Sequence, residues 1–169
     1  MIPNLLWTAV FVVPVAIFCY TFVTPKMIYL LLGGSCIPIF FPNSFFDRIQ
    51  ASRNSQWYRK VGVRYINTFA QSGALVNKLL KKKFPGYKTV SGTRASIRKH
   101  YYQTYLFEKF HFSLFLFFAF MTIHAGSHGY WYWVLILTIS NLLYNVYPNL
   151  LQQYIRVKLE SAKQVKKIP

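Results

Sequence analysis

The sequence predicts an all-α, polytopic membrane protein with about four membrane-embedded helices and with amphipathic helices at the cytoplasmic interface. Composition is the first reason. The chain of 169 residues is 54% hydrophobic and 14% charged, whereas a soluble domain of this size carries about 25% charged residues. The second reason is that apolar runs alternate with basic segments, and the formal net charge is +17. This pattern is typical of an integral membrane protein with a basic aqueous face.

The first two apolar runs differ in length and in interruptions. Residues 5–23 are long enough to cross a bilayer as a helix. No Lys or Arg precedes this run and no small-residue cleavage site follows it, so we expect a retained helix and not a signal peptide. The run at residues 27–41 is shorter than the first run and is interrupted by Gly33, Gly34 and Pro38. They are predicted to form a short span or a re-entrant segment among the other helices, with the span favoured.

Residues 42–104 form the polar middle of the chain. They hold 13 of its 20 Lys and Arg residues, and Asp47 is their one acidic residue. Apolar and aromatic residues still recur there at helical spacing, which predicts amphipathic helices that lie on the membrane surface. The basic charge indicates topology and attraction to anionic headgroups. Nucleic-acid binding is the weaker alternative and is not expected, because the sequence shows no recognition module.

Two further spans are predicted over residues 105–124 and 130–151. The first is almost wholly apolar and has about the length that crosses a bilayer. The second follows a tight turn and opens with a run of Tyr and Trp that is typical of a membrane interface. The tail, residues 152–169, is basic and continues the last helix as an amphipathic end. We therefore assign residues 1–169 to a single membrane domain.

The distribution of charge predicts the orientation of the chain. The polar middle and the tail are both strongly basic, so both are expected on the cytoplasmic side. With four spans the amino terminus is also inside, and with a re-entrant second segment it is outside. In either case the middle and the tail stay inside. We expect an integral, multi-pass protein of the cell's inner membrane with a functional cytoplasmic face.

A carboxylate and an imidazole open the span at residues 105–124. Glu108 and His111 are three residues apart, which places them on one face of a helix. Ionisable groups at the edge of a span are costly and mark a functional site by default. The last span and its continuation carry a polar stripe at helical spacing, which we expect to face this pair. The stripe consists of Asn141, Asn145, Asn149, Gln152 and Arg156.

The residues at this predicted site suit acid–base chemistry. The sequence holds no zinc-ligand set, no phosphate-binding loop and no Gly-x-Ser-x-Gly motif, and we expect neither a metal nor a cofactor. A His beside a carboxylate can act as a general base on a hydroxyl, which makes His111 the candidate base and Glu108 its partner. Asn145, Gln152 and Arg156 could then bind an oxyanion, a sugar or a phosphate. The alternative is that these polar residues hold the helices together.

A resemblance sharpens this interpretation. Residues 145–159, NVYPNLLQQYIRVKL, are similar to the carboxyl-terminal signature of a small membrane family, the glycosyl-diaponeurosporenoate acyltransferases of staphyloxanthin-type carotenoid synthesis. That signature is roughly Asn-x-x-Pro-x-x-x-Gln-Arg-Tyr-Asn-Arg-x-Arg-Leu. The family also has Glu-x-x-His at the start of the preceding span, as Glu108 and His111 do here. The likeness covers roughly residues 57 to 159. Three positions depart from the signature: Gln153, Ile155 and Lys158.

The resemblance implies a membrane acyltransferase that moves a fatty acyl chain onto a sugar hydroxyl of a glycosylated carotenoid or a related glycolipid. Its partners would be an acyl donor, a lipid-borne sugar acceptor and a bilayer with anionic headgroups. Tyr154, within the matched motif, joins the predicted substrate-binding residues. Lys81, Lys82 and Lys83 are predicted to bind anionic lipid or the phosphates of the donor. The alternative function is that of a non-enzymatic lipid-binding or assembly protein.

Overall fold

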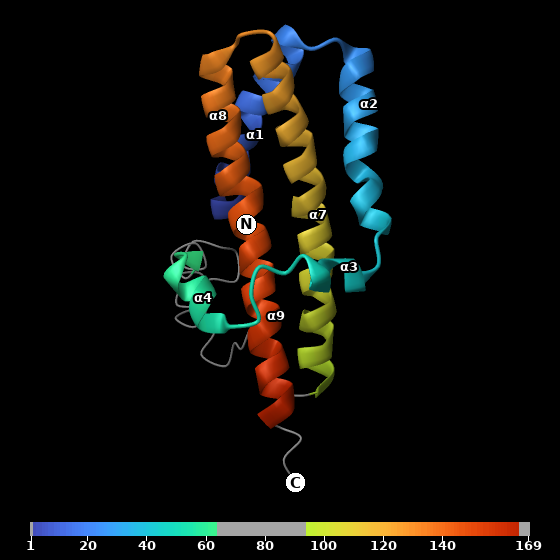
Figure 1. The fold of residues 1–169 in the computed structure, drawn as a ribbon, viewed down its shortest axis with the longest axis vertical. Helices are drawn as coiled ribbons and strands as arrows, with labels where there is room; N and C mark the ends of the chain where they lie inside the picture. The colour runs from blue at the N-terminus through green and yellow to red at the C-terminus, as the bar shows by residue number, and fades with distance from the viewer. Residues whose placement is uncertain (1, 64–93, 166–169) are drawn as a thin grey trace. The chain divides into compact units, whose positions relative to one another are not determined.

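A computed structural model describes residues 2–63 and 94–165 of the chain (Figure 1). These residues form helices and the segments that join them, and no strand occurs among them. The predicted all-α fold is therefore confirmed. The chain divides into two compact units. Unit 1 comprises the described residues of Asn43–Glu108 and Asn149–Pro169, and unit 2 comprises Ile2–Pro42 and Lys109–Pro148. The assignment to a single membrane domain stays a prediction.

Unit 2 begins with two helices. Helix α1 covers Ile2–Phe22 and helix α2 covers Pro25–Cys36, followed by a short 3-10 helix, η1, at Ile37–Phe40. Pro25 stands in the first turn of α2, where its fixed φ suits a helix start and its missing N–H costs no hydrogen bond. The two predicted apolar runs, residues 5–23 and 27–41, are thus mainly helical.

Two long helical stretches follow. Helix α7 covers Arg94–Ser127, with its residues up to Glu108 in unit 1 and the rest in unit 2. Helix α8, Trp131–Asn141, continues through η2, a π-helical turn at Leu142–Val146, into α9 at Tyr147–Val165. By length and composition, both stretches can cross a membrane. The other two predicted spans stay predictions.

Gly129 makes the reversal between these two stretches possible. Its φ is +76°, a left-handed conformation that glycine adopts without the steric cost of a Cβ. Its N–H bonds to the carbonyl of Gly126, and the N–H of Tyr130 bonds to the carbonyl of Ala125. These bonds end α7 and start α8.

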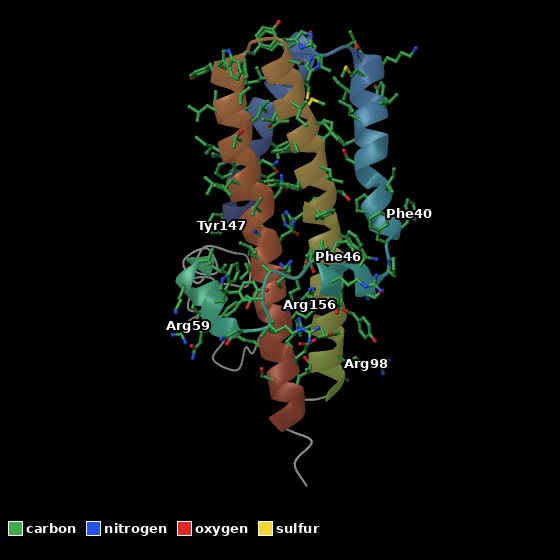
Figure 2. All side chains as sticks on the ribbon, viewed as in Figure 1. Phe40, Phe46, Arg59, Arg98, Tyr147 and Arg156 are labelled. Carbon is green, nitrogen blue, oxygen red and sulfur yellow. The ribbon has the colours of Figure 1, made fainter. Side chains whose placement is uncertain are left out.

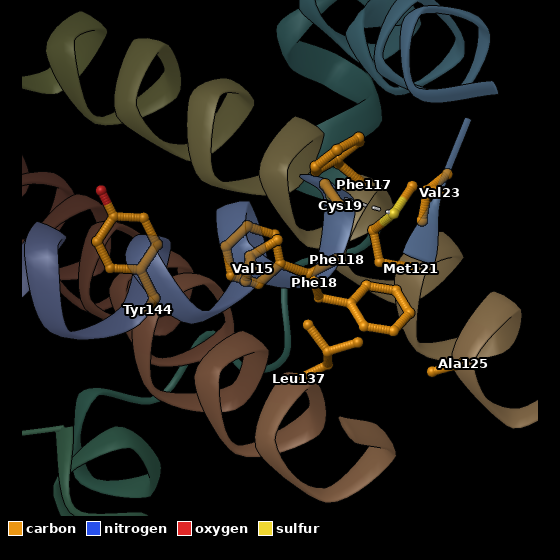
Figure 3. Packing of buried hydrophobic residues seen from close by; sticks show 10 residues of the cluster. All are labelled: Val15, Phe18, Cys19, Val23, Phe117, Phe118, Met121, Ala125, Leu137 and Tyr144. Atoms are coloured by element: carbon orange, nitrogen blue, oxygen red, sulfur yellow. Dashed lines mark hydrogen bonds between the residues drawn. The ribbon is translucent and has the colours of Figure 1, made fainter. Parts of the chain in front are cut away.

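The apolar core of unit 2 is formed by α1, α7 and α8 (Figure 3). Phe18 of α1, Met121 of α7 and Leu137 of α8 are fully buried in it. The Sγ atom of Cys19 lies 3.5 Å from the Sδ atom of Met121, and both cysteines of the chain are free. Cys19 therefore packs as a small core residue.

Unit 1 combines two short helices with the ends of the long ones. Helix α3 covers Asn43–Arg48 and helix α4 covers Ser55–Lys60. Asn54 caps α4, since its side-chain oxygen accepts the backbone N–H of Gln56 at 2.8 Å. A small apolar core packs α4 against α9 and consists of Tyr58, Val63, Leu151, Tyr154 and Val157. The rest of the predicted interfacial segment, residues 64–93, lies outside the described part of the chain.

Candidate functional site

A buried ion pair lies at the centre of unit 1. Arg156 of α9 is 0% exposed and Glu108 of α7 is 1% exposed, and Nη1 of Arg156 donates to Oε2 of Glu108. A buried charge is tolerated when it is paired and its remaining donors are satisfied. Nε and Nη2 of Arg156 both lie within hydrogen-bond distance of Oε1 of Gln50, at 3.2 and 3.0 Å. Each nitrogen of the guanidinium therefore has a protein acceptor. Figure 2 shows Arg156 beside Phe46, whose carbonyl lies 3.5 Å from Nη2.

Aromatic hydroxyls extend this network to the other two acidic residues of the chain. The guanidinium of Arg156 lies 4.4 Å over the ring of Tyr105, and the Tyr105 hydroxyl donates to Oδ1 of Asp47 at 2.6 Å. The hydroxyl of Tyr101 lies 3.1 Å from that of Tyr105 and donates to Glu160 at 2.8 Å. An ion pair of 3.7 Å between Nε of Arg156 and Oδ1 of Asp47 completes the connection. All three acidic residues of the sequence therefore belong to one network of hydrogen bonds, ion pairs and a cation–π contact in unit 1.

Gln153 links the ion pair to the segment between α3 and α4. Its Nε2 donates to Oε1 of Glu108 at 2.7 Å, and its Oε1 accepts the backbone N–H of Ala51 at 3.0 Å. The hydroxyl of Tyr58 lies 3.1 Å from the same Oε1 and 2.8 Å from the carbonyl of Ser52. Burial raises the pKa of the Tyr58 phenol above its ordinary value. The phenol therefore stays neutral at physiological pH and can donate.

A second polar group lies in unit 2, around the π-helical turn of η2. Asn145 is 0% exposed and donates from Nδ2 to Oδ1 of Asn141 at 2.9 Å. Asn141 in turn donates to the carbonyl of Phe115 at 3.1 Å. The ring of His111 packs edge-on against that of Tyr144, with 5.9 Å between centroids. Nδ1 of His111 and Oδ1 of Asn145 are both buried without a hydrogen-bond partner.

The structure distributes the predicted site residues between the two units. Glu108 and Arg156 lie in unit 1, and His111 and Asn145 lie in unit 2. The hydrogen bonds of the Glu108 carboxylate run to Gln153 and Arg156. Among the described residues, no group of three or more His, Cys, Asp and Glu side chains could hold a metal ion.

The remaining predicted residues have different surroundings. Gln152 is partly exposed, and the amide that contacts Glu108 is that of its neighbour Gln153. Tyr154 is 5% exposed, and its ring packs against that of Tyr58 with 6.1 Å between centroids. The predicted patch at Lys81, Lys82 and Lys83 lies outside the residues that the structure describes.

Sequence reasoning missed several members of the unit 1 network: Gln50, Tyr58, Tyr101, Tyr105 and Gln153. The sequence did mark the acidic members of the network, because the chain has three acidic residues against 20 Lys and Arg residues. Asp47 and Glu160 could have been added to Glu108 on that ground. The tyrosines and glutamines gave no comparable signal, since their types are common at interfaces.

The sequence of the chain matches the model of one protein family. The sequence model described as glycosyl-4,4'-diaponeurosporenoate acyltransferase matches residues 42–164, which is most of the chain. The match includes Glu108, His111, Asn145 and Arg156. No curated protein and no solved structure matches the chain.

Proposed function

Because the chain belongs to the glycosyl-4,4'-diaponeurosporenoate acyltransferase family, we propose that it moves a fatty acyl chain onto a sugar hydroxyl of a glycosylated carotenoid or a related glycolipid. The family match carries this proposal. It confirms the resemblance seen in the sequence, and it favours an enzyme over a non-enzymatic lipid-binding or assembly protein. Two long apolar helices suit a lipid-borne acceptor and an acyl donor that reach the enzyme from a bilayer.

His111 is the proposed general base. A neutral imidazole can take a proton from a hydroxyl, and the ring of His111 packs against Tyr144 of the π-helical turn with 5.9 Å between ring centroids. In the proposed step, a ring nitrogen of His111 takes the proton of the acceptor hydroxyl while the hydroxyl oxygen attacks the acyl carbonyl carbon. The bond between the acyl group and the donor then breaks, and the imidazolium returns the proton to the leaving group. One ester bond forms and one acyl–donor bond breaks.

Glu108 and Arg156 are proposed to position the site. Arg156 is fully buried and its donors are engaged by Glu108, Gln50 and the Phe46 carbonyl. These bonds support a role in holding the α3–α4 segment against α9 more than a role in binding substrate directly. That Glu108 stabilises the His111 imidazolium stays a prediction.

Other groups are proposed to bind the substrates. Asn145 offers an unpaired buried oxygen, and Gln152 is partly exposed and therefore accessible. Tyr154 stays a predicted substrate-binding residue, as do Lys81, Lys82 and Lys83 for anionic lipid or donor phosphate. We place the reaction on the cytoplasmic face, because clustered Lys and Arg favour that side of the membrane.

Lipid profiling of a deletion strain tests the proposed function. We expect the acylated glycolipid to disappear and its precursor with a free sugar hydroxyl to accumulate, as measured by mass spectrometry of lipid extracts. Wild-type protein should restore the product. At equal abundance in the membrane, His111→Ala should lower turnover roughly 10²- to 10⁴-fold, the usual contribution of a general base.

Ser113→Ala is the matched control for His111→Ala. Ser113 lies two residues further along α7, and its Oγ is likewise buried without a hydrogen-bond partner. This variant should restore the product fully. A deletion strain in which no precursor accumulates would contradict acyl transfer. Full restoration by His111→Ala would contradict the role of that residue as the base.

A further inference from the structure

Two histidines stand at the carboxyl end of α7. His124 lies in the last turn of the helix and His128 follows four residues later, so both side chains lie on one side of the helix end. Their ring centroids are 4.3 Å apart. His128 and its neighbours Ser127 and Gly129 are exposed, so solvent reaches the pair. The proposed acyl transfer uses neither imidazole.

Backbone carbonyls beside this pair determine which ring nitrogen carries the proton. Nδ1 of His128 lies 2.9 Å from the carbonyl oxygen of His124, and Nε2 of His124 lies 3.4 Å from that of Phe22 in α1. A carbonyl oxygen can only accept, so each of these two nitrogens is an N–H. In the neutral rings the lone pairs are therefore on Nε2 of His128 and Nδ1 of His124. Metal-binding histidines have this arrangement, since one ring nitrogen donates to a carbonyl or carboxylate and the other binds the ion.

The helix ends around the pair favour a cation. Helix α1 ends at Phe22 and helix α7 ends at Ser127, and both ends lie at the same end of unit 2 (Figure 1). The last carbonyls of a helix lack intrahelical donors, and they give its C-terminus a partial negative charge. Two such ends supply negative potential in a unit that has no carboxylate, because all three acidic residues of the sequence lie in unit 1.

The two imidazoles limit which ions can bind. Imidazole nitrogen suits Zn²⁺, Cu²⁺ and Ni²⁺, whereas Mg²⁺ and Ca²⁺ prefer oxygen. Two histidines four residues apart on a helix are a known zinc-binding pair. A Zn–N bond is about 2.0–2.1 Å long, so two ligating nitrogens lie at most about 4 Å apart, and rings with centroids 4.3 Å apart are near enough to share an ion. Two protein ligands are fewer than a complete zinc-ligand set, and the exposure of His128 lets water supply the others.

We propose that His124 and His128 form a two-histidine site for a divalent transition ion of the class of Zn²⁺, Cu²⁺ and Ni²⁺. Nδ1 of His124 and Nε2 of His128 bind the ion, and water fills its remaining positions. Because His124 also contacts the carbonyl of Phe22, the bound ion holds the end of α7 against the end of α1 and stabilises unit 2. This site is independent of the proposed acyl transfer, whose candidate base is His111.

Metal titration tests the site directly. The probe is Ni²⁺, titrated by calorimetry into the full chain without an affinity tag in phosphatidylcholine nanodiscs, with empty nanodiscs as the blank. Wild-type protein should bind one ion, and Mg²⁺ should not displace it. His128→Ala should weaken binding about 10²-fold, because the second ligand of a linked pair acts at a high effective concentration. His100→Ala removes a partly exposed histidine elsewhere on α7, and this matched control should bind Ni²⁺ as wild type does.

Thermal melting of the same samples tests whether the ion joins the two helix ends. Ni²⁺ should raise the melting temperature of wild-type protein, because it binds the folded state, and should leave that of His128→Ala unchanged. Since His128 is exposed, this variant should fold. A wild-type protein that binds no Ni²⁺, or a folded His128→Ala that binds it equally well, would overturn the site. Binding without a rise in melting temperature would overturn the link between α7 and α1.

Discussion

Arg156 shows how one side chain can organise a unit of this protein. A guanidinium that is 0% exposed has lost its hydration, and the low dielectric around it makes an unpaired charge very costly. Glu108 supplies the opposite charge, Gln50 supplies a further acceptor, and the face of Tyr105 covers the cation. Removing one partner should therefore destabilise the fold, because the other charge would stay buried without compensation. Replacing both partners with apolar residues should cost much less.

Single and double substitutions should show this dependence. Glu108→Met or Arg156→Met leaves one buried charge without its partner, and we expect each to lower the free energy of unfolding by about 3–5 kcal/mol. The double variant removes both charges and should recover much of that loss. Melting temperatures of the purified protein in detergent measure the effect. Glu160→Gln, at an exposed tyrosine contact, is the control and should change little. Additive losses in the double variant would contradict this account.

At the scale of elements, α9 joins the segment between α3 and α4 to the start of α7. Gln153 and Arg156 are three residues apart and so lie on one face of α9. Gln153 bonds to Glu108 of α7 and to Ala51 of the segment. Gln50, Ala51 and Ser52 of the segment each bond to a side chain of α4 or α9, so the order of the segment depends on these bonds.

Limited proteolysis should detect the loss of this link. Arg53 lies in the segment and is exposed, so trypsin can cleave after it when the segment opens. Gln153→Ala removes the bonds to Glu108, Ala51 and Tyr58, and cleavage after Arg53 should accelerate about tenfold. Mass spectrometry of the fragments follows that one site. Gln152→Ala, the adjacent control, should leave the rate unchanged. An unchanged rate in Gln153→Ala would show that the segment is held by other contacts.

At the scale of the whole molecule, charge is distributed unevenly along the chain. The acids lie in unit 1, and the basic residues cluster in the polar middle and in the tail. The long apolar stretches between them carry few charges. Such clustering of Lys and Arg sets the orientation of a membrane protein, because basic segments are retained in the cytoplasm.

Reporter fusions measure this orientation. A reporter joined after Lys83 and one joined after Lys167 should both be active in the cytoplasm. A reporter after Lys26 should lie on the outer side if the second apolar run spans. A Lys167 fusion in which neutral residues replace the basic residues of the tail is the control for the effect of charge on orientation. An external signal from the unaltered Lys83 or Lys167 fusion would contradict the predicted topology.

The sequence by itself determined the helical class and the family. Helices follow from local periodicity and from apolar runs long enough to cross a bilayer, which are properties of contiguous residues. The motif over residues 145–159 also lies within one stretch, and the family match over residues 42–164 confirms the resemblance that it suggested. Glu108 and His111 could be chosen as candidates from the sequence because placing ionisable side chains in an apolar span costs free energy and usually marks a functional site.

Tertiary structure alone decided which polar groups meet. Gln152 and Gln153 point about 100° apart on a helix, and the rotation of α9 in its packing selects Gln153 as the contact of Glu108. The bond between Asp47 and Tyr105 joins residues 58 apart in the sequence, so no local pattern could reveal it. The orientation of the Asn141 amide depends on the carbonyl of Phe115, which α7 supplies. Periodicity places a residue on a face of its own helix, whereas the identity of the facing group depends on how distant segments pack.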